Sequence, residues 1–309
     1  MKKRVLLLYW TAFFIFCFSS VISAVDRTAR SSVIFSSGLK PYRESWEGIK
    51  EFLEAEKVTL WAAEHNLKEK KPKEVFSKIR SERPDVVFTL GTRASKLAKE
   101  GLEDLPVVFS MVLDPGMIVG SNITGVSLDI PAGMKLKEVK RILPDVKRIG
   151  LIYSPGTISK YREISQVCQE LDLQLITGKI DDRKDLPGAL KEIAGQIDCF
   201  LMIPDPKIYF PRSVEYLLLE SLRKRFPVVG LSRLYTKAGA LLSFDCDYKD
   251  LGRQAGEIAL RILDGENPAD IQPQRPGKIK FSLNLLTAER LGIKIPSVII
   301  TEASEVFGK

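Results

Sequence analysis

The sequence predicts an α/β protein made of two doubly wound parallel sheets, and three observations lead to this prediction. Short apolar, β-branched runs alternate with amphipathic stretches, each run is continuously apolar, and the alternation occurs in two successive series. Continuous apolar strands separated by helices are typical of a parallel sheet covered on both faces. A length of 309 residues with 45% hydrophobic content is enough for two such lobes.

The first series runs from about residue 30 to residue 126. Its expected strands are the apolar runs at 33–35, 58–61, 86–90 and 107–111, and a further strand begins at Val126. Amphipathic stretches follow the first three runs, and Trp46 lies on the apolar face of the first stretch. This spacing predicts one doubly wound lobe, with Trp46 in its core.

The second series begins after Pro144, with expected strands at 149–153, 173–176, 199–203 and 228–231. Beyond it we expect a strand over 238–244 and a long helix carrying Leu251 and Ile258 that ends at Gly265. Pro268, Pro273 and Pro276 then predict a linker.

The N-terminus has the plan of a secretory signal. A basic start (residues 1–4) precedes an apolar run over 5–18 and a serine-rich end at Ala24. This pattern predicts a signal peptide over residues 1–24 that is cleaved after Ala24, with an uncleaved membrane anchor as the alternative. Either outcome predicts a protein that works outside the cytoplasm, in the periplasm.

Composition argues against several other classes. The formal charge of +8 falls to +5 without residues 2–4, and the surplus forms no arginine-rich stripe, so no nucleic-acid partner is expected. His65 is the single histidine, and Cys168, Cys199 and Cys246 have no C-x-x-C spacing, so we expect no metal, no cofactor and no disulfide. His65 stands in a polar stretch and is expected at the surface.

Catalytic motifs are also missing from the sequence. There is no phosphate-binding G-x-x-x-x-G-K-[ST] loop and no H-E-x-x-H, and Gly230–Leu234 lacks the second glycine of a nucleophile elbow. We therefore expect no enzyme.

Candidate ligand-binding residues lie in the loops that follow the strands, because ligands of open parallel sheets bind beyond the carboxyl ends of the strands. These loops and their surroundings give the following candidates: Ser36, Ser37, Tyr42, Gly91, Thr92, Ser110, Asp114, Tyr153, Asp205 and Ser232.

Two roles are expected among these candidates. Gly91 and Thr92, at a strand-to-helix junction, would hold an anionic group with backbone amides and a hydroxyl; alternatively, Gly91 makes a turn and Thr92 caps the helix. Asp205 would receive an ammonium group, or else it is a turn residue between prolines. Asp114 before Pro115 fits a turn better than a ligand contact, and Tyr42 would stack on a ligand.

Several segments resemble the periplasmic substrate-binding proteins of ABC transporters, in the family that includes receptors for tryptophan and other aromatic amino acids. The segments are Pro106–Phe109, Asp114-Pro115, Asn122–Val126, Leu143–Gly150, Ala238–Ser243, Asp247-Tyr248, Leu251–Ala255, Ile262–Gly265 and Asn284–Pro296. The resemblance covers the chain from about Val33 to Phe307.

This resemblance implies a type I periplasmic-binding fold, in which three crossovers join two lobes that close on a ligand like a hinge. It places residues 30–126 and 238–268 in lobe 1, and residues 127–237 and 269–309 in lobe 2. By position it assigns Gly91 and Thr92 to the first-lobe ligand loop and Asp205 to an acidic contact. Arg93 and Pro206 depart from the family pattern, so an aromatic amino-acid ligand does not follow.

The expected function is that of a monomeric solute receptor that delivers a small polar or amino-acid-like ligand to an ABC permease in the membrane. One alternative is a sensor that closes on its ligand in the same way and signals to a membrane kinase instead of a transporter. A periplasmic enzyme on the same scaffold is another, which the missing motifs disfavour.

Overall fold

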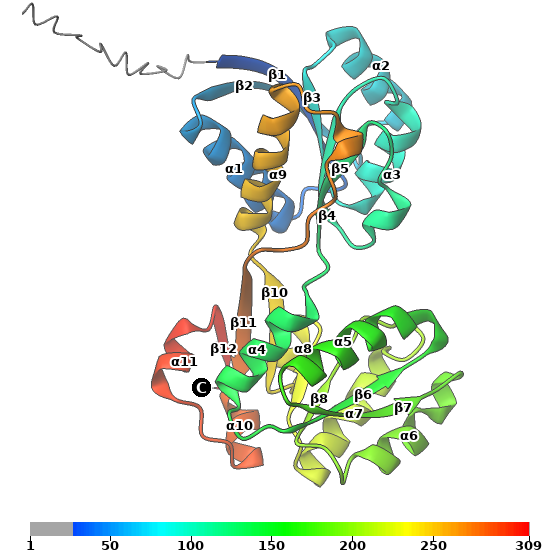
Figure 1. The fold of residues 1–309 in the computed structure, drawn as a ribbon, viewed down its shortest axis with the longest axis vertical. Helices are drawn as coiled ribbons and strands as arrows, with labels where there is room; N and C mark the ends of the chain where they lie inside the picture. The colour runs from blue at the N-terminus through cyan, green and yellow to red at the C-terminus, as the bar shows by residue number, and fades with distance from the viewer. Residues whose placement is uncertain (1–26, 309) are drawn as a thin grey trace, which may run out of the picture.

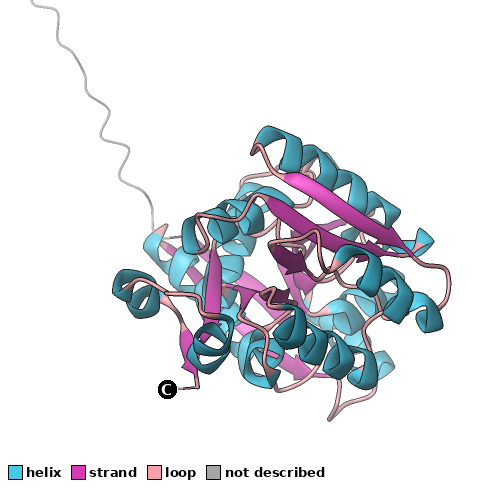
Figure 2. Cartoon of the chain, turned by 90° about the horizontal axis from the view of Figure 1, so that it is seen from below, coloured by secondary structure: helices cyan, strands magenta, loops and turns pink. Residues whose placement is uncertain are grey.

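The computed structural model describes residues 27–308, and the chain folds into two α/β lobes joined by three crossovers (Figure 1). The predicted signal peptide, residues 1–24, lies outside the described residues. Helices flank the strands on both sides of the sheets (Figure 2). The two doubly wound lobes expected from the sequence are confirmed.

Lobe 1 holds a five-stranded, fully parallel sheet in the order β2-β1-β3-β4-β5. Its strands are β1 (Arg27–Phe35), β2 (Val58–Asn66), β3 (Val86–Leu90), β4 (Val107–Val112) and β5 (Ile123–Ser127). One face packs on α1 (Lys40–Ala55) and α9 (Tyr248–Leu263), with Trp46 buried there as predicted. The other face packs on α2 (Pro72–Glu82) and α3 (Thr92–Gly101).

Lobe 2 holds a seven-stranded sheet in the order β12-β11-β10-β9-β8-β6-β7, in which only the β10–β11 pair is antiparallel. Its strands are β6 (Arg148–Tyr153), β7 (Gln174–Lys179), β8 (Cys199–Leu201), β9 (Val228–Gly230), β10 (Leu242–Cys246), β11 (Ile279–Asn284) and β12 (Glu305–Phe307).

The helices of lobe 2 cover both faces of its sheet. On one face lie α4 (Ala132–Ile142), α5 (Ile158–Glu170) and α11 (Ser297–Glu302), and on the other lie α6 (Leu186–Ile193) and α7 (Pro211–Lys224). The short helices α8 (Arg233–Ala238) and α10 (Leu285–Leu291) precede β10 and follow β11.

The expected lobe boundaries are corrected at two places. We expected residues 238–268 in lobe 1, but β10 pairs with β9 and β11, so the chain stays in lobe 2 until Cys246. We expected lobe 2 to resume at residue 269, yet Gln274 still bonds to β5 in lobe 1. The three crossovers therefore run over 128–131, at Asp247 and over 275–278.

Helices α1 and α9, far apart in the sequence, lie against each other at two glycines. A Cβ atom on Gly252 would lie 1.9 Å from the carbonyl oxygen of Ser45, and one on Gly48 would lie 2.0 Å from that of Lys249. No side chain fits at either position. This close contact fixes α9, which returns from lobe 2, onto the sheet of lobe 1.

His65 is buried rather than exposed, which makes the surface expectation wrong. Strand β2 extends to Asn66, and His65 pairs with Ile34 of β1, so its side chain is only 3% exposed. No protein atom among residues 27–308 accepts from or donates to its ring nitrogens.

Candidate functional site

A pocket of about 390 Å³ lies between the lobes, and residues 128–130 of the first crossover line it. Lobe 1 contributes the loop after β4 and the start of α9, and lobe 2 contributes α4, α5 and the ends of β8, β9 and β10. Its lining residues are Leu113, Asp114, Leu128, Asp129, Ile130, Lys135, Lys160, Met202, Pro204, Gly230, Leu231, Ser232, Phe244, Asp245, Cys246 and Tyr248. A solute in this pocket would contact both lobes and one of the segments that joins them.

A network of ion pairs, in which Asp129 and Lys160 also line the pocket, joins the crossovers to α5. The carboxylate of Asp129 pairs with Lys160 and, at 2.9 Å, with Arg275. Glu163 of α5 pairs with Arg275 at 2.8 Å and with Lys160 at 3.3 Å, and it also accepts a hydrogen bond from the Ala132 amide. Hydrogen bonding to Ala132 and the two cations keep the pKa of Glu163 below its usual value, against the effect of burial.

Lys135, on the first turn of α4, also lines the pocket. It is half-buried and forms no ion pair within 4 Å with any residue of 27–308. Burial lowers the pKa of its ammonium group; the nearby Asp129 and Glu163 oppose this effect, and Lys160 and Arg275 add to it. Lys135 is therefore a partly desolvated cation without an ion-pair partner within 4 Å among residues 27–308.

Asp245, the second-last residue of β10, brings a carboxylate to the same pocket. Its Oδ2 atom accepts a hydrogen bond of 3.1 Å from the amide of Arg233. Burial raises the pKa of Asp245. Neighbouring Tyr248 is also desolvated, which together with Asp245 raises its pKa to about 12 and keeps its hydroxyl protonated.

The candidates that follow β1 and β3 lie together at one edge of lobe 1, outside the lining of this pocket. Gly91 has a φ of 95°, and a Cβ atom there would lie 2.6 Å from the hydroxyl of Tyr42 and 2.8 Å from that of Ser36. The Ser36 hydroxyl accepts a hydrogen bond of 2.9 Å from the Ala94 amide. The hydroxyl that caps α3 is thus that of Ser36 in the neighbouring loop.

Thr92 does not cap its own helix, since it is the first residue of α3. Its hydroxyl instead accepts a hydrogen bond of 3.5 Å from the amide of Leu113, in the loop after β4. Ser37 is buried next to Ser36. In the alternative to an anion-binding role, the turn at Gly91 is confirmed and the cap at Thr92 is wrong.

The other candidates lie in different surroundings. Ser110 is fully buried, and its hydroxyl is 2.9 Å from that of Ser45, so it belongs to the core of lobe 1. Tyr153 stacks on Tyr161 with ring centroids 4.4 Å apart. Asp114 and Ser232 do line the pocket, and Asp114 also accepts from the Gly116 amide in the turn expected before Pro115.

Asp205 is 4% exposed, and both of its carboxylate oxygens have protein partners. Oδ2 accepts hydrogen bonds from the hydroxyls of Ser154 at 2.6 Å and Thr157 at 3.0 Å, and Oδ1 accepts from the Lys207 amide at 2.9 Å. The carboxylate thereby joins the loop after β8 to the loop after β6. In this conformation Asp205 has the contacts of a structural residue.

Sequence reasoning missed Lys135 and Asp245. Asp245 directly follows the apolar run that ends at Phe244, the same signal that indicated Asp114 and Asp205, so it could have been found. Lys135 gives no such signal, because its place in the pocket depends on how the first crossover positions α4.

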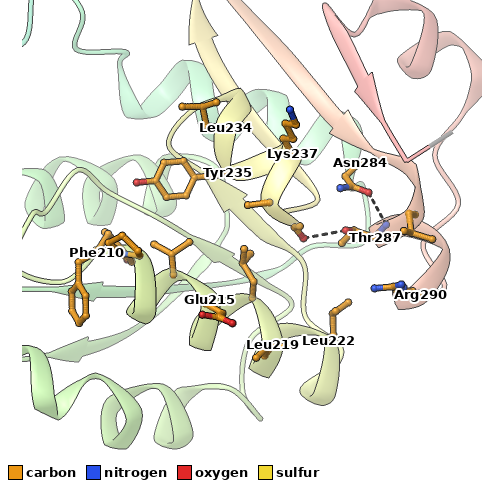
Figure 3. Close-up of a pocket in the computed structure, with 17 residues that line it drawn as sticks. Phe210, Glu215, Leu219, Leu222, Leu234, Tyr235, Lys237, Asn284, Thr287 and Arg290 are labelled. Carbon is orange, nitrogen blue, oxygen red and sulfur yellow. Dashed lines mark hydrogen bonds between the residues drawn. The ribbon is translucent and has the colours of Figure 1, made fainter.

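A larger hollow of about 750 Å³ lies on lobe 2 alone, between α7, α8 and α10 (Figure 3). Its walls are mostly apolar, with Leu219, Leu234 and Leu286 exposed. Asn284 accepts from the Thr287 amide, and the Thr287 hydroxyl donates to the Gly239 carbonyl, as Figure 3 shows. A ligand held there would touch one lobe only, so hinge closure could not enclose it.

The described residues offer little other chemistry. No group of three or more metal-binding side chains occurs among residues 27–308. Cys168, Cys199 and Cys246 are free and buried, and burial raises the pKa of each thiol. None of the helices described here combines the length and apolar composition needed to cross a membrane.

The sequence matches the family described as ABC transporter substrate binding protein over residues 41–307. The chain belongs to this family. It is a family of solute-binding proteins rather than enzymes, and its members are typically extracytoplasmic. The resemblance inferred from the sequence motifs is thereby confirmed.

Curated relatives of this chain include a tyrosine-binding protein of Clostridioides difficile (strain R20291), which is 23% identical over 231 residues, or 71% of this chain. An uncharacterized protein of Rickettsia prowazekii is 25% identical over 202 residues, or 64% of this chain. The chain spans 66% and 63% of the length of these two relatives.

Two solved structures share the fold. The ligand-free, open structure of a substrate-binding protein with adhesive properties from Clostridium difficile has a TM-score of 0.72 and 19% identity. A Streptococcus pneumoniae ABC domain in complex with L-Trp has a TM-score of 0.56 and 22% identity. Both alignments cover 91% of this chain and 100% of the other, and they confirm the type I periplasmic-binding fold.

Proposed function

We propose that this protein is the extracytoplasmic receptor of an ABC importer, which binds a small amino-acid-like or polar solute between its lobes and delivers it to a membrane permease. The pocket between the lobes carries this proposal, because loops of both lobes and a crossover segment line it. Rotation about the crossovers would then convert ligand binding into a change of shape that a permease can recognise.

The relatives support an amino-acid-like ligand. One is named for tyrosine binding, and a protein of the same fold was solved with L-Trp. The pocket of this chain combines apolar walls, such as Leu231 and Phe244, with charged groups at Lys135 and Asp245, which suits a small molecule with polar ends.

The edge of lobe 1 would supply further contacts after closure. Ser36, Ser37, Tyr42, Gly91 and Thr92 lie together at the carboxyl ends of β1 and β3 and the N-terminus of α3. In the present arrangement they do not line the pocket. We propose that closure brings this edge over the bound solute, so that both lobes hold it.

A thermal-shift screen against amino acids, sugars and small organic acids tests this function. A ligand that binds only the native protein should stabilise it by about 2.7 kcal/mol at a hundredfold excess over its Kd. Small-angle scattering with that compound should show a smaller radius of gyration. A screen without any stabilising solute, or a scattering profile that stays the same with a saturating one, would contradict the proposal.

A further inference from the structure

Among residues 27–308, the pocket between the lobes holds one positive charge without an ion-pair partner within 4 Å. Asp129 and Lys160 lie in its wall; Lys160 and Arg275 share the carboxylates of Asp129 and Glu163, so two cations pair with two anions. Lys135 is a third cation near these two carboxylates, which attract it, but it forms no ion pair within 4 Å with the described residues. A half-buried ammonium without a partner costs free energy that an anionic group in the pocket would offset.

The same pocket contains a negative charge at the end of β10. The Asp245 carboxylate is partly desolvated and accepts only one hydrogen bond from the described residues, that from the Arg233 amide. Lys135 and Asp245 lie close enough to Cys246 that both influence the pKa of its thiol. Charges of opposite sign therefore occur within one small cavity, beside the apolar side chains of Met202 and Leu231.

We propose that Lys135 binds the carboxylate, and Asp245 the ammonium group, of a zwitterionic ligand, which makes these two residues the determinants of ligand class. This inference rests on the proposed receptor function and names the chemistry of its ligand. It moves the two charge contacts away from Thr92 and Asp205. Each of those residues already has a protein partner.

The first experiment compares three ligand-free variants by chemical denaturation. Lys135→Met should unfold at a higher denaturant concentration than the parent, because it removes an unpaired, desolvated charge from an apolar stem. Lys160→Met should unfold at a lower concentration, because it leaves Asp129 and Glu163 with fewer partners. Lys137→Met, at an exposed position of the same helix, is the matched control and should behave like the parent. A Lys135→Met protein that is less stable than the parent overturns the inference.

The second experiment measures binding of L-tyrosine, L-tryptophan and the other common amino acids, each beside its carboxamide and its deaminated acid. The parent should bind the best amino acid at least tenfold more tightly than either analogue, since each analogue leaves one buried charge unpaired. Lys135→Met should bind the amino acid and its carboxamide equally. Asp245→Asn should likewise lose the preference for the amino acid over the deaminated acid.

The outcomes separate this inference from the receptor function. If a sugar or another uncharged solute binds tightly, and Lys135→Met binds it equally well, the inference is wrong while the receptor function stands. If no compound of any class binds, both are wrong. If ligand-free Lys135→Met is more stable than the parent and binds an amino acid and its carboxamide equally, both the inference and the receptor function are supported.

Discussion

Two charged residues of lobe 2 differ in their surroundings, although both are near the cleft. Asp205 accepts hydrogen bonds from Ser154, Thr157 and Lys207, and its carboxylate holds two loops together. Lys135 lies in the pocket with no ion-pairing partner among residues 27–308. A polar residue at a strand end is therefore a weak sign of a ligand contact when protein atoms already satisfy it.

Lobe 1 shows the same contrast among neutral groups. Ser95 is fully buried, and its hydroxyl bonds with that of Thr89 and donates to the Gly91 carbonyl. Ser32 is equally buried, at 1% exposure, but no protein atom among the described residues bonds to its hydroxyl. Buried polar groups in this protein therefore divide into those that stabilise the fold and those that cost it stability.

Removal of the Asp205 carboxylate should have the largest effect on stability. Asp205→Ala leaves the hydroxyls of Ser154 and Thr157 and the Lys207 amide without their acceptor, so we expect a loss of about 3 kcal/mol, measured by chemical denaturation. Asp114→Ala is the control: it removes one exposed hydrogen bond and should cost less than about 1 kcal/mol.

The same variant also tests the ligand contact that the sequence predicts for Asp205. If Asp205→Ala is as stable as the parent but loses affinity for an amino acid that the parent binds, the carboxylate serves the ligand. In that case Asp205 would be a ligand contact although protein atoms satisfy its carboxylate, and the contrast with Lys135 would be wrong.

His65 is a buried polar residue without a hydrogen-bond partner among residues 27–308, and its effect on stability can be tested through pH. Burial and the nearby Lys78 and Lys70 lower the pKa of His65 from its usual 6.5, whereas Glu82 opposes them. Between the folded pKa and 6.5 the unfolded chain binds more protons than the native protein, so this residue makes stability fall as the pH drops below 6.5. His65→Leu should remove that part of the acid sensitivity.

The measurement for His65 is the denaturation midpoint of parent and variant at pH 7.5 and pH 5. The parent should lose more stability than His65→Leu over this interval. An equal loss of stability in the two proteins would mean that the imidazole of His65 has a hydrogen-bond partner in solution. His65 would then be a satisfied buried group, like Ser95.

The smallest expected effect concerns a single hydroxyl. Ser32→Ala removes a buried group that no described residue satisfies, so the free energy of unfolding should stay within about 0.5 kcal/mol of the parent or rise. Ser95→Ala removes a hydroxyl with two partners and should cost about 1 kcal/mol or more. Equal losses in the two variants would contradict the division drawn above.

Much of the fold was predictable because it depends on local patterns. The apolar run at 86–90 matches β3, and the helix expected to end at Gly265 ends at Leu263. The lobe that receives β10 was not predictable, since pairing with β9 and β11 is decided by distant segments. The polar neighbours of His65 likewise gave no sign that His65 is buried near Lys78 and Glu82 of α2.

The candidate site was predictable only in part, for the same reason. The strand-end rule found Asp114 and Ser232, which line the pocket, but it also selected Ser110, which lies in the core. No rule that works along the chain could find Lys135. Its importance comes from the pairing of its neighbours with each other, which only the assembled crossovers create.

The contact of α1 with α9 has a consequence for how the chain folds. The core of lobe 1 includes Leu251, Ala255 and Ile258, which are made about 200 residues after α1. The sheet of lobe 2 likewise lacks β11 and β12 until the last thirty residues arrive. Neither lobe can therefore be completed when only the first half of the chain has been synthesised. The two lobes reach their native packing late and nearly together.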